Sequence, residues 1–166
     1  QRAMIAMALA SKPRLLIADE PTTALDVTVQ ARVLKLIQRL QRELGLALML
    51  ITHDLGVIAH TVEYVYVMYL GQVIEEGPVV EIFDNPAHPY TQALVSAVSV
   101  LSDDRVVVPT VLRRDLDEAY ETEGCGLSPR CHYVEAGCNS PQPLRDLTNG
   151  HQVACWKAEQ LMKVEG

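Results

Sequence analysis

Two adjacent carboxylates follow a short apolar run near the start of the 166-residue chain. Residues 15–18 read Leu-Leu-Ile-Ala, and Asp19, Glu20 and Pro21 come next. The run is typical of a buried parallel strand, which delivers its last residues to the sheet edge where α/β folds bind ligands. There the first carboxylate suits Mg²⁺, and the second can orient and polarise an attacking water in phosphoryl transfer. Alone, the pattern fits equally well a strand that ends in solvated acids.

A histidine occupies the matching position after a second apolar run. Residues 46–51 form this run, and His53 follows it closely. If both runs are neighbouring parallel strands, His53 lies one strand over from Asp19 and Glu20, where it can hydrogen-bond a γ-phosphate oxygen and hold the catalytic carboxylate. A single histidine at a strand end is more often structural. Asp26, six residues after Glu20, adds a third feature in order, and the three together favour a phosphoryl-transfer site.

The cysteines suggest a second, separate site. All of them lie between residues 125 and 155, namely Cys125, Cys131, Cys138 and Cys155. Four thiolates bind either Zn²⁺ or an iron–sulfur cluster, and the spacing lacks the C-x2-C pairs that zinc sites favour. A pair of disulfides is the third interpretation, although the rest of the chain looks cytosolic. His132 and His151 lie nearby and are expected at the surface.

The elements that must position these residues alternate between strand and helix over residues 1–77, which indicates an α/β layered fold. Apolar residues spaced by three and four from Val29 predict an amphipathic helix that ends at Gly45. A short helix is expected over residues 54–62. Two β segments, residues 64–70 and 72–76, follow it on either side of a glycine turn.

The rest of the chain divides into three parts. Residues 78–100 are expected to be helical, with a break at residues 85–89, which contain two prolines. Residues 101–124 are charged and without a period, as in a linker, and residues 125–166 form a cysteine-rich extension. The predicted domains are therefore residues 1–100, the linker 101–124 and the extension 125–166.

Composition limits the possible partners. The chain has 14 Lys and Arg against 21 Asp and Glu, a formal charge of −7, which argues against non-specific nucleic-acid binding. Its longest apolar run, residues 46–51, is far shorter than a membrane-spanning helix. Residues 1–20 lack a signal-peptide pattern, so a soluble, cytoplasmic protein is expected. The start at Gln1 suggests a piece of a longer protein.

These motifs resemble the C-terminal half of an ABC-transporter nucleotide-binding domain, a P-loop NTPase of the α/β class. Residues 15–20 match the Walker B motif, with Asp19 at the magnesium position and Glu20 as the catalytic carboxylate. Residues 24–26 match the D-loop, which in the family crosses the dimer interface, so Asp26 is expected near the nucleotide. His53 matches the switch histidine. The resemblance implies ATP and Mg²⁺ as ligands, and because the P-loop, Q-loop and signature motif are missing here, this chain alone is expected to be inactive.

The resemblance narrows at residues 88–94, His-Pro-Tyr-Thr-Gln-Ala-Leu, which are similar to a stretch shared by the ATPase subunits of oligopeptide and dipeptide importers. That subfamily also carries a C-terminal cysteine segment, thought to hold a 4Fe–4S cluster. The resemblance therefore implies that the four cysteines ligate such a cluster, with Zn²⁺ as the alternative. His132 stands where the family commonly has proline, which leaves the ligand spacing unchanged.

The resemblance implies an ATP-hydrolysing subunit that powers peptide import from the cytoplasmic face of the cell membrane. Its implied partners are a second ABC ATPase subunit (identical or paralogous), transmembrane permease subunits and, indirectly, a substrate-binding protein, with no nucleic acid. The alternative is a soluble ABC-type ATPase without a transport role, whose metal-binding module serves interactions.

Overall fold

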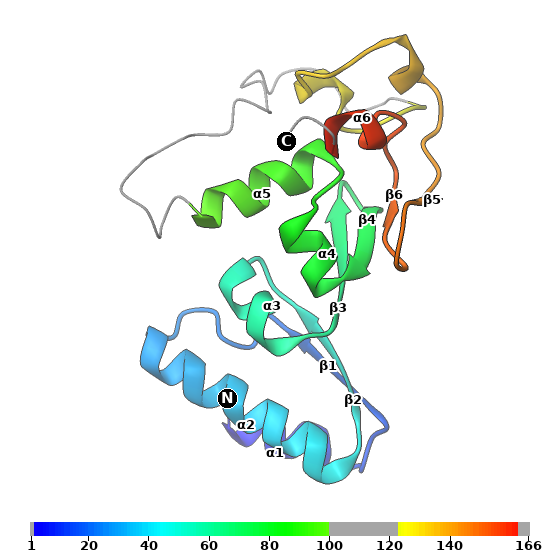
Figure 1. Cartoon of the computed structure of the whole chain (residues 1–166). Helices are drawn as coiled ribbons and strands as arrows, with labels where there is room; N and C mark the ends of the chain where they lie inside the picture. Colours follow the sequence, from blue (N-terminus) through cyan, green and yellow to red (C-terminus); the bar gives the residue numbers. More distant parts are fainter. Residues whose placement is uncertain (1, 100–122, 163–166) are drawn as a thin grey trace. The chain divides into compact units, whose positions relative to one another are not determined.

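The computed structural model describes residues 2–99 and 123–162. The fold is mixed α/β, and its elements belong to two compact units, Gln1–Val62 and Glu63–Gly166 (Figure 1). The linker predicted over residues 101–124 lies almost wholly outside the described residues, and the predicted domain boundaries stay predictions. Within the described ranges, no helix has both the length and the apolar character needed to cross a membrane.

The first unit contains two parallel strands and three helices. In chain order they are α1 (Arg2–Leu9), β1 (Leu15–Asp19), α2 (Val27–Leu44), β2 (Ala47–Ile51) and α3 (Leu55–Thr61). The predicted parallel pairing of the two apolar runs is confirmed, with Asp19 opposite Ile51 at the end of the ladder. The residues that follow β1 and β2 therefore leave the sheet at the same edge.

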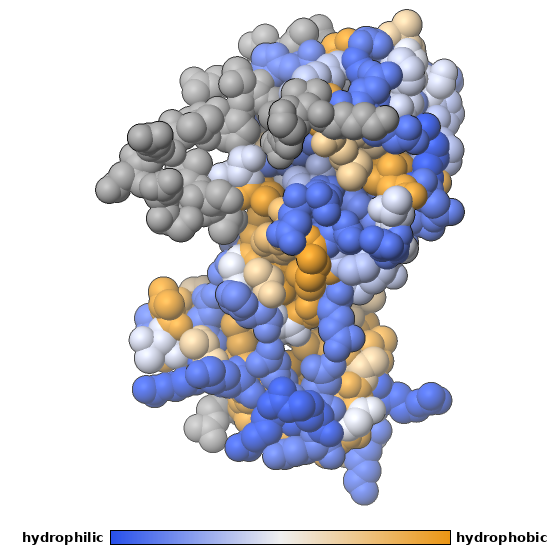
Figure 2. Space-filling view, viewed as in Figure 1, coloured by the Kyte–Doolittle hydropathy of each residue, from blue (hydrophilic) through white to orange (hydrophobic). Residues whose placement is uncertain are grey.

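Helix α2 supplies the core of this unit. Asp26 caps its start, because the Asp26 carboxylate accepts a hydrogen bond from the Val29 backbone N–H at 2.9 Å. Gly45 ends it in the left-handed conformation with φ of 64°, as the sequence predicted. The helix buries Val33 and Ile37, which pack with Leu16 of β1 and with Leu46, just before β2, while the face seen in Figure 2 is polar.

Both strands are less buried than the sequence predicted. Their apolar runs indicated burial on both faces, but β1 alternates between buried and exposed residues. Leu16 packs against α2, whereas Leu15, Ile17, Met49 and Ile51 are about half exposed. The reason is that, among the described residues, helices cover only one face of this two-stranded sheet.

The second unit is built on a four-stranded antiparallel sheet in the order β3-β4-β6-β5. The strands are β3 (Tyr64–Tyr69), β4 (Gln72–Pro78), β5 (Arg145–Asp146) and β6 (Gln152–Val153). The helices are α4 (Val79–Asp84), α5 (Pro89–Ser99) and α6 (Ala158–Met162), with the short 3₁₀ turns η1 (Ser128–Arg130) and η2 (Ala136–Asn139). The predicted break at residues 85–89 is confirmed, since α4 ends before it and α5 begins at its last proline.

The cysteine-bearing segment joins this sheet through β6. Glu75 and Glu76 of β4 pair with Val153 and Gln152, so residues far apart in the sequence share one sheet. A small core of Ala87, Val153 and Ala158 lies beneath this pairing. The segment therefore shares its core with the loop between α4 and α5.

Candidate functional site

Glu20 sits at the turn that ends β1. Its backbone N–H donates to the Ile51 carbonyl at 2.8 Å, which extends the parallel ladder by one residue. Its φ is +43°, a left-handed backbone that non-glycine residues adopt at a cost of roughly 1–2 kcal/mol. Such strained conformations concentrate at functional sites, where the surrounding structure holds them.

The carboxylate of Glu20 is held by two side chains. Oε2 accepts a hydrogen bond from the Thr23 hydroxyl at 2.6 Å, and Oε1 lies 2.8 Å from Nδ1 of His53. The sequence placed Glu20 and His53 at the same sheet edge, and the structure brings them into contact. The glutamate and histidine side chains are 42% and 81% exposed, so both are open to a ligand.

The contact between Glu20 and His53 shifts the pKa values of the two side chains in opposite directions. The hydrogen bond from Thr23, and next that from His53, lower the pKa of the Glu20 carboxyl. The hydrogen bond to Glu20, followed by the Glu20 charge, raises the pKa of His53. The charged carboxylate and the imidazolium are therefore both favoured.

The other two predicted acids are placed differently. Asp19 is exposed at the end of β1, next to Glu20 in sequence. The carboxylate of Asp26 caps α2, so it already has a structural partner. Asp54 caps α3 in the same way through the Val57 N–H at 3.2 Å.

The four cysteines line one cavity of the second unit, whose volume is about 20 Å³. The four cysteines were predicted to ligate one metal cluster, and the structure brings them around a shared space. His88 and Lys157 line the same cavity. Burial, together with the charges of the other cysteines, raises the pKa of Cys155 to about 11.

The structure does not support the predicted metal. Within residues 2–99 and 123–162, no group of three or more His, Cys, Asp or Glu side chains is arranged to hold a metal ion. The volume of the cavity is close to that of one water-sized group. The 4Fe–4S prediction therefore rests on two features, the presence of four cysteine thiols and the cavity that they line together.

Comparison with known proteins finds similarity to proteins named for peptide transport. The family described as "Oligopeptide/dipeptide transporter, C-terminal region" matches residues 74–138. A Brucella abortus protein named for peptide import and ATP binding is 46% identical over 155 residues, which are 93% of this chain and 47% of that protein. The chain is a relative of peptide-import ATP-binding proteins.

Two further similar proteins are also named for peptide transport and ATP binding. The dipeptide transport ATP-binding protein DppD of Escherichia coli is 46% identical, over 93% of this chain and 48% of its own length. The oligopeptide transport ATP-binding protein OppD of Salmonella typhimurium is 44% identical, over 98% of this chain and 49% of its own length. The chain thus spans about half the length of the curated relatives it matches.

The solved structures similar to this chain include one from an ABC transporter complex. It is the cbiO1 protein of Clostridium perfringens, described as part of the ABC transporter complex cbiONQ. It is 32% identical, with a TM-score of 0.48, and the match covers 61% of this chain and 41% of that one.

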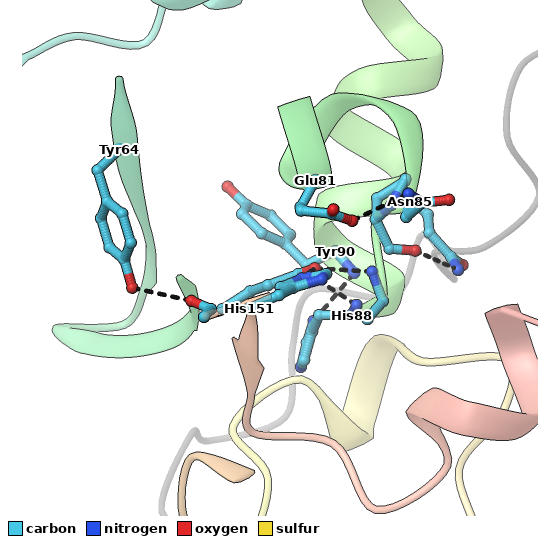
Figure 3. A network of polar contacts seen from close by, with 11 residues as sticks. Tyr64, Glu81, Asn85, His88, Tyr90 and His151 are labelled. Atoms are coloured by element: carbon cyan, nitrogen blue, oxygen red, sulfur yellow. Dashed lines mark hydrogen bonds and ion pairs between the residues drawn. The ribbon is translucent and has the colours of Figure 1, made fainter. Parts of the chain in front are cut away.

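The stretch shared with peptide importers, residues 88–94, meets a buried carboxylate that the sequence did not single out. The two oxygens of Glu75 accept hydrogen bonds from the backbone N–H groups of Ala87 and His88, at 2.7 and 2.8 Å. His151 Nε2 lies 2.7 Å from the same carboxylate, and both side chains are fully buried. Figure 3 shows His88 and His151 side by side, below helix α4.

The expectation that His151 lies at the surface is wrong. A histidine in a loop rich in polar residues predicts exposure, but the pairing of β6 with β4 carries His151 inward onto Glu75. The expectation for His132 is confirmed, because this side chain is exposed.

The sequence analysis also missed Thr23 as a partner of Glu20, although its position three residues after Glu20 is the spacing of a side chain that bonds back across a turn.

Proposed function

We propose that this chain is the part of an ABC-type ATPase that carries its catalytic carboxylate, in a protein that powers peptide import. The observation that carries the proposal is the 2.8 Å contact between Glu20 and His53 at the ends of neighbouring parallel strands. In this proposal residues 15–20 are the Walker B motif, and residues 125–166 are a cysteine-rich extension. The similarity to peptide-import ATP-binding proteins supports the choice of substrate class.

Each residue of the pair has a distinct task. Glu20, kept ionised by Thr23 and His53, accepts a hydrogen bond from the attacking water and polarises it. Because Nδ1 of His53 is engaged by Glu20, Nε2 is the ring nitrogen that can reach a γ-phosphate oxygen. A raised pKa keeps a proton on Nε2 for this bond.

The remaining acids bind rather than react. Asp19 would hold Mg²⁺, directly or through its waters, and the ion would supply charge neutralisation at the phosphates. Asp26, fixed by its bond to α2, would lie beside the second ATPase subunit. The 166-residue chain alone is expected not to turn over ATP, because it contains no glycine-rich loop with a lysine to cradle the phosphates.

The complete protein would act at the cytoplasmic face of the membrane. We expect it to pair with a second ATPase subunit and to bind transmembrane permease subunits, which receive peptide from a substrate-binding protein. The similarity to importer ATP-binding proteins supports these partners.

Replacing Glu20 by glutamine in the complete protein tests the catalytic assignment. We expect Glu20→Gln and His53→Ala each to lower the ATP hydrolysis rate by about 10²–10⁴-fold while ATP binding is kept. Glu43→Gln, which changes an exposed glutamate on α2, is the matched control and should leave the rate unchanged. A Glu20→Gln protein with more than half of the original rate would refute the role of Glu20.

We also propose that the four cysteines hold a 4Fe–4S cluster as thiolates. Their arrangement around one cavity supports this. Protein purified without oxygen should contain about four irons and four sulfides per chain. Cys138→Ser should lose both, whereas one bound zinc, or disulfides without metal, would reject the cluster.

A further inference from the structure

The position of His53 depends on the turn that carries it. The histidine side chain is 81% exposed, so packing does little to orient the ring toward Glu20. The contact between the two side chains is made at 2.8 Å, a distance that a small displacement of the backbone at residue 53 would lengthen. Whatever holds the turn between β2 and α3 therefore also holds His53.

Asp54, the next residue, fixes this turn to two helices. Its Oδ1 accepts the Val57 backbone N–H at 3.2 Å and so caps α3. Its Oδ2 accepts a hydrogen bond at 2.9 Å from Nε2 of Gln30, which lies on α2. The Asp54 backbone N–H in turn donates to the Thr52 hydroxyl at 3.1 Å. The carboxylate is thus shared between α2 and α3, directly beside the histidine.

Gln30 is a firm support for this bond. It lies at the end of the first turn of α2, where its backbone N–H donates to the Asp26 carbonyl at 2.9 Å. Val29 and Val33 of the same helix pack into the core of the first unit, so this end of α2 is held in place. Gln30 and Asp54 are both partly buried, and a hydrogen bond from an amide to a partly shielded carboxylate is stronger than one at the open surface.

We propose that Gln30 is a positioning residue for ATP hydrolysis, which through the Asp54 carboxylate holds the turn between β2 and α3 so that His53 meets Glu20. The inference rests on the proposed function, in which Glu20 and His53 do the chemistry. Gln30 acts through Asp54 and His53 rather than on ATP. Its loss therefore slows the chemical step and leaves nucleotide binding intact.

A change of charge pattern tests the bond between Gln30 and Asp54. Gln30→Glu removes the donor and sets a second carboxylate against that of Asp54. Asp54→Asn keeps an oxygen for the cap of α3 and offers an amide N–H in place of the other oxygen. In the double variant Gln30→Glu/Asp54→Asn, this N–H can donate to the new carboxylate at position 30, which restores the bond with its direction reversed.

Gln38→Glu is the matched control. Gln38 lies further along the same helix, and its Nε2 donates to the His60 carbonyl near the other end of α3, at 3.2 Å. The substitution removes the same kind of bond between α2 and α3 but leaves the turn at His53 unchanged.

The measurement is the rate of ATP hydrolysis by the complete protein as a function of ATP concentration. We expect Gln30→Glu to lower kcat about tenfold with KM for ATP unchanged, because a displaced His53 impairs only the chemical step. The double variant should regain most of the lost rate, and Gln38→Glu should match the original protein. An unaltered kcat in Gln30→Glu, a double variant as slow as Gln30→Glu, or an equal loss in Gln38→Glu would overturn the inference.

Glu20→Gln and His53→Ala are measured in the same assay. If both keep the original rate, the proposed function fails and the inference fails with it. If both lose it and Gln30→Glu does not, the inference alone fails. Should Gln30→Glu not fold, Gln30→Leu takes its place, since it removes the donor without adding a charge, and an original kcat in this variant overturns the inference.

Discussion

At the scale of single residues, the proposed chemistry depends on the contact between Glu20 and His53. The sequence predicted their proximity because both follow apolar runs that pair as parallel strands. It did not predict Thr23 as a second partner, although the three-residue spacing from Glu20 suits a side chain that bonds back across a turn. His151 was misplaced because its burial depends on a pairing of strands far apart in sequence.

The Glu20–His53 pair has a defined pH dependence. Because the pKa of Glu20 is lowered and that of His53 is raised, both groups are charged between these two values. The attraction weakens as the pH falls through the pKa of Glu20, and again as it rises through that of His53. Glu20→Gln should therefore lower the pKa of His53 toward its ordinary value.

Proton NMR of the His53 ring measures this shift, with His60, an exposed histidine of α3, as the reference in the same spectrum. An unaltered His53 titration in Glu20→Gln would show that the two side chains are not bonded in solution.

At the scale of elements, most of the helices and strands could be predicted, because the apolar spacing, the prolines and Gly45 mark them in the sequence. The two-residue strands β5 and β6 could not, since so short a strand has no period. They are defined only by the partners they meet, and β6 is what ties the cysteine segment to β4.

Gly124 is packed closely against the backbone of the cysteine segment. A Cβ there would lie 2.2 Å from the Cys138 carbonyl oxygen and 2.6 Å from the backbone of Asn139. Neither can move away easily, because the same carbonyl accepts the Cys125 N–H at 2.8 Å. Gly124→Ala should therefore destabilise the segment by about 1–3 kcal/mol.

Limited proteolysis of the segment, read against Gly126→Ala, checks this. A Cβ at Gly126 meets the Leu70 side chain at 3.4 Å and the Tyr69 ring at 4.0 Å, both ordinary contacts. Faster cleavage within residues 123–140 is expected for Gly124→Ala alone. Equal cleavage of both variants would mean that the close approach of Gly124 to Cys138 is not needed.

At the scale of the whole molecule, the central claim is that ATP hydrolysis at Glu20 drives peptide import. The chain spans about half of its named relatives, so the claim must be tested in the complete protein. The decisive system is a vesicle that holds this protein with its permease subunits, with the substrate-binding protein supplied on the opposite side.

The measurement is the uptake of labelled peptide by these vesicles. The account predicts uptake that requires ATP, that falls to background with Glu20→Gln and that persists with Glu43→Gln, because Glu20 contacts His53 whereas Glu43 pairs with Arg39 on the surface of α2. Failure of the protein to associate with the membrane subunits, or equal uptake with Glu20→Gln, would contradict it.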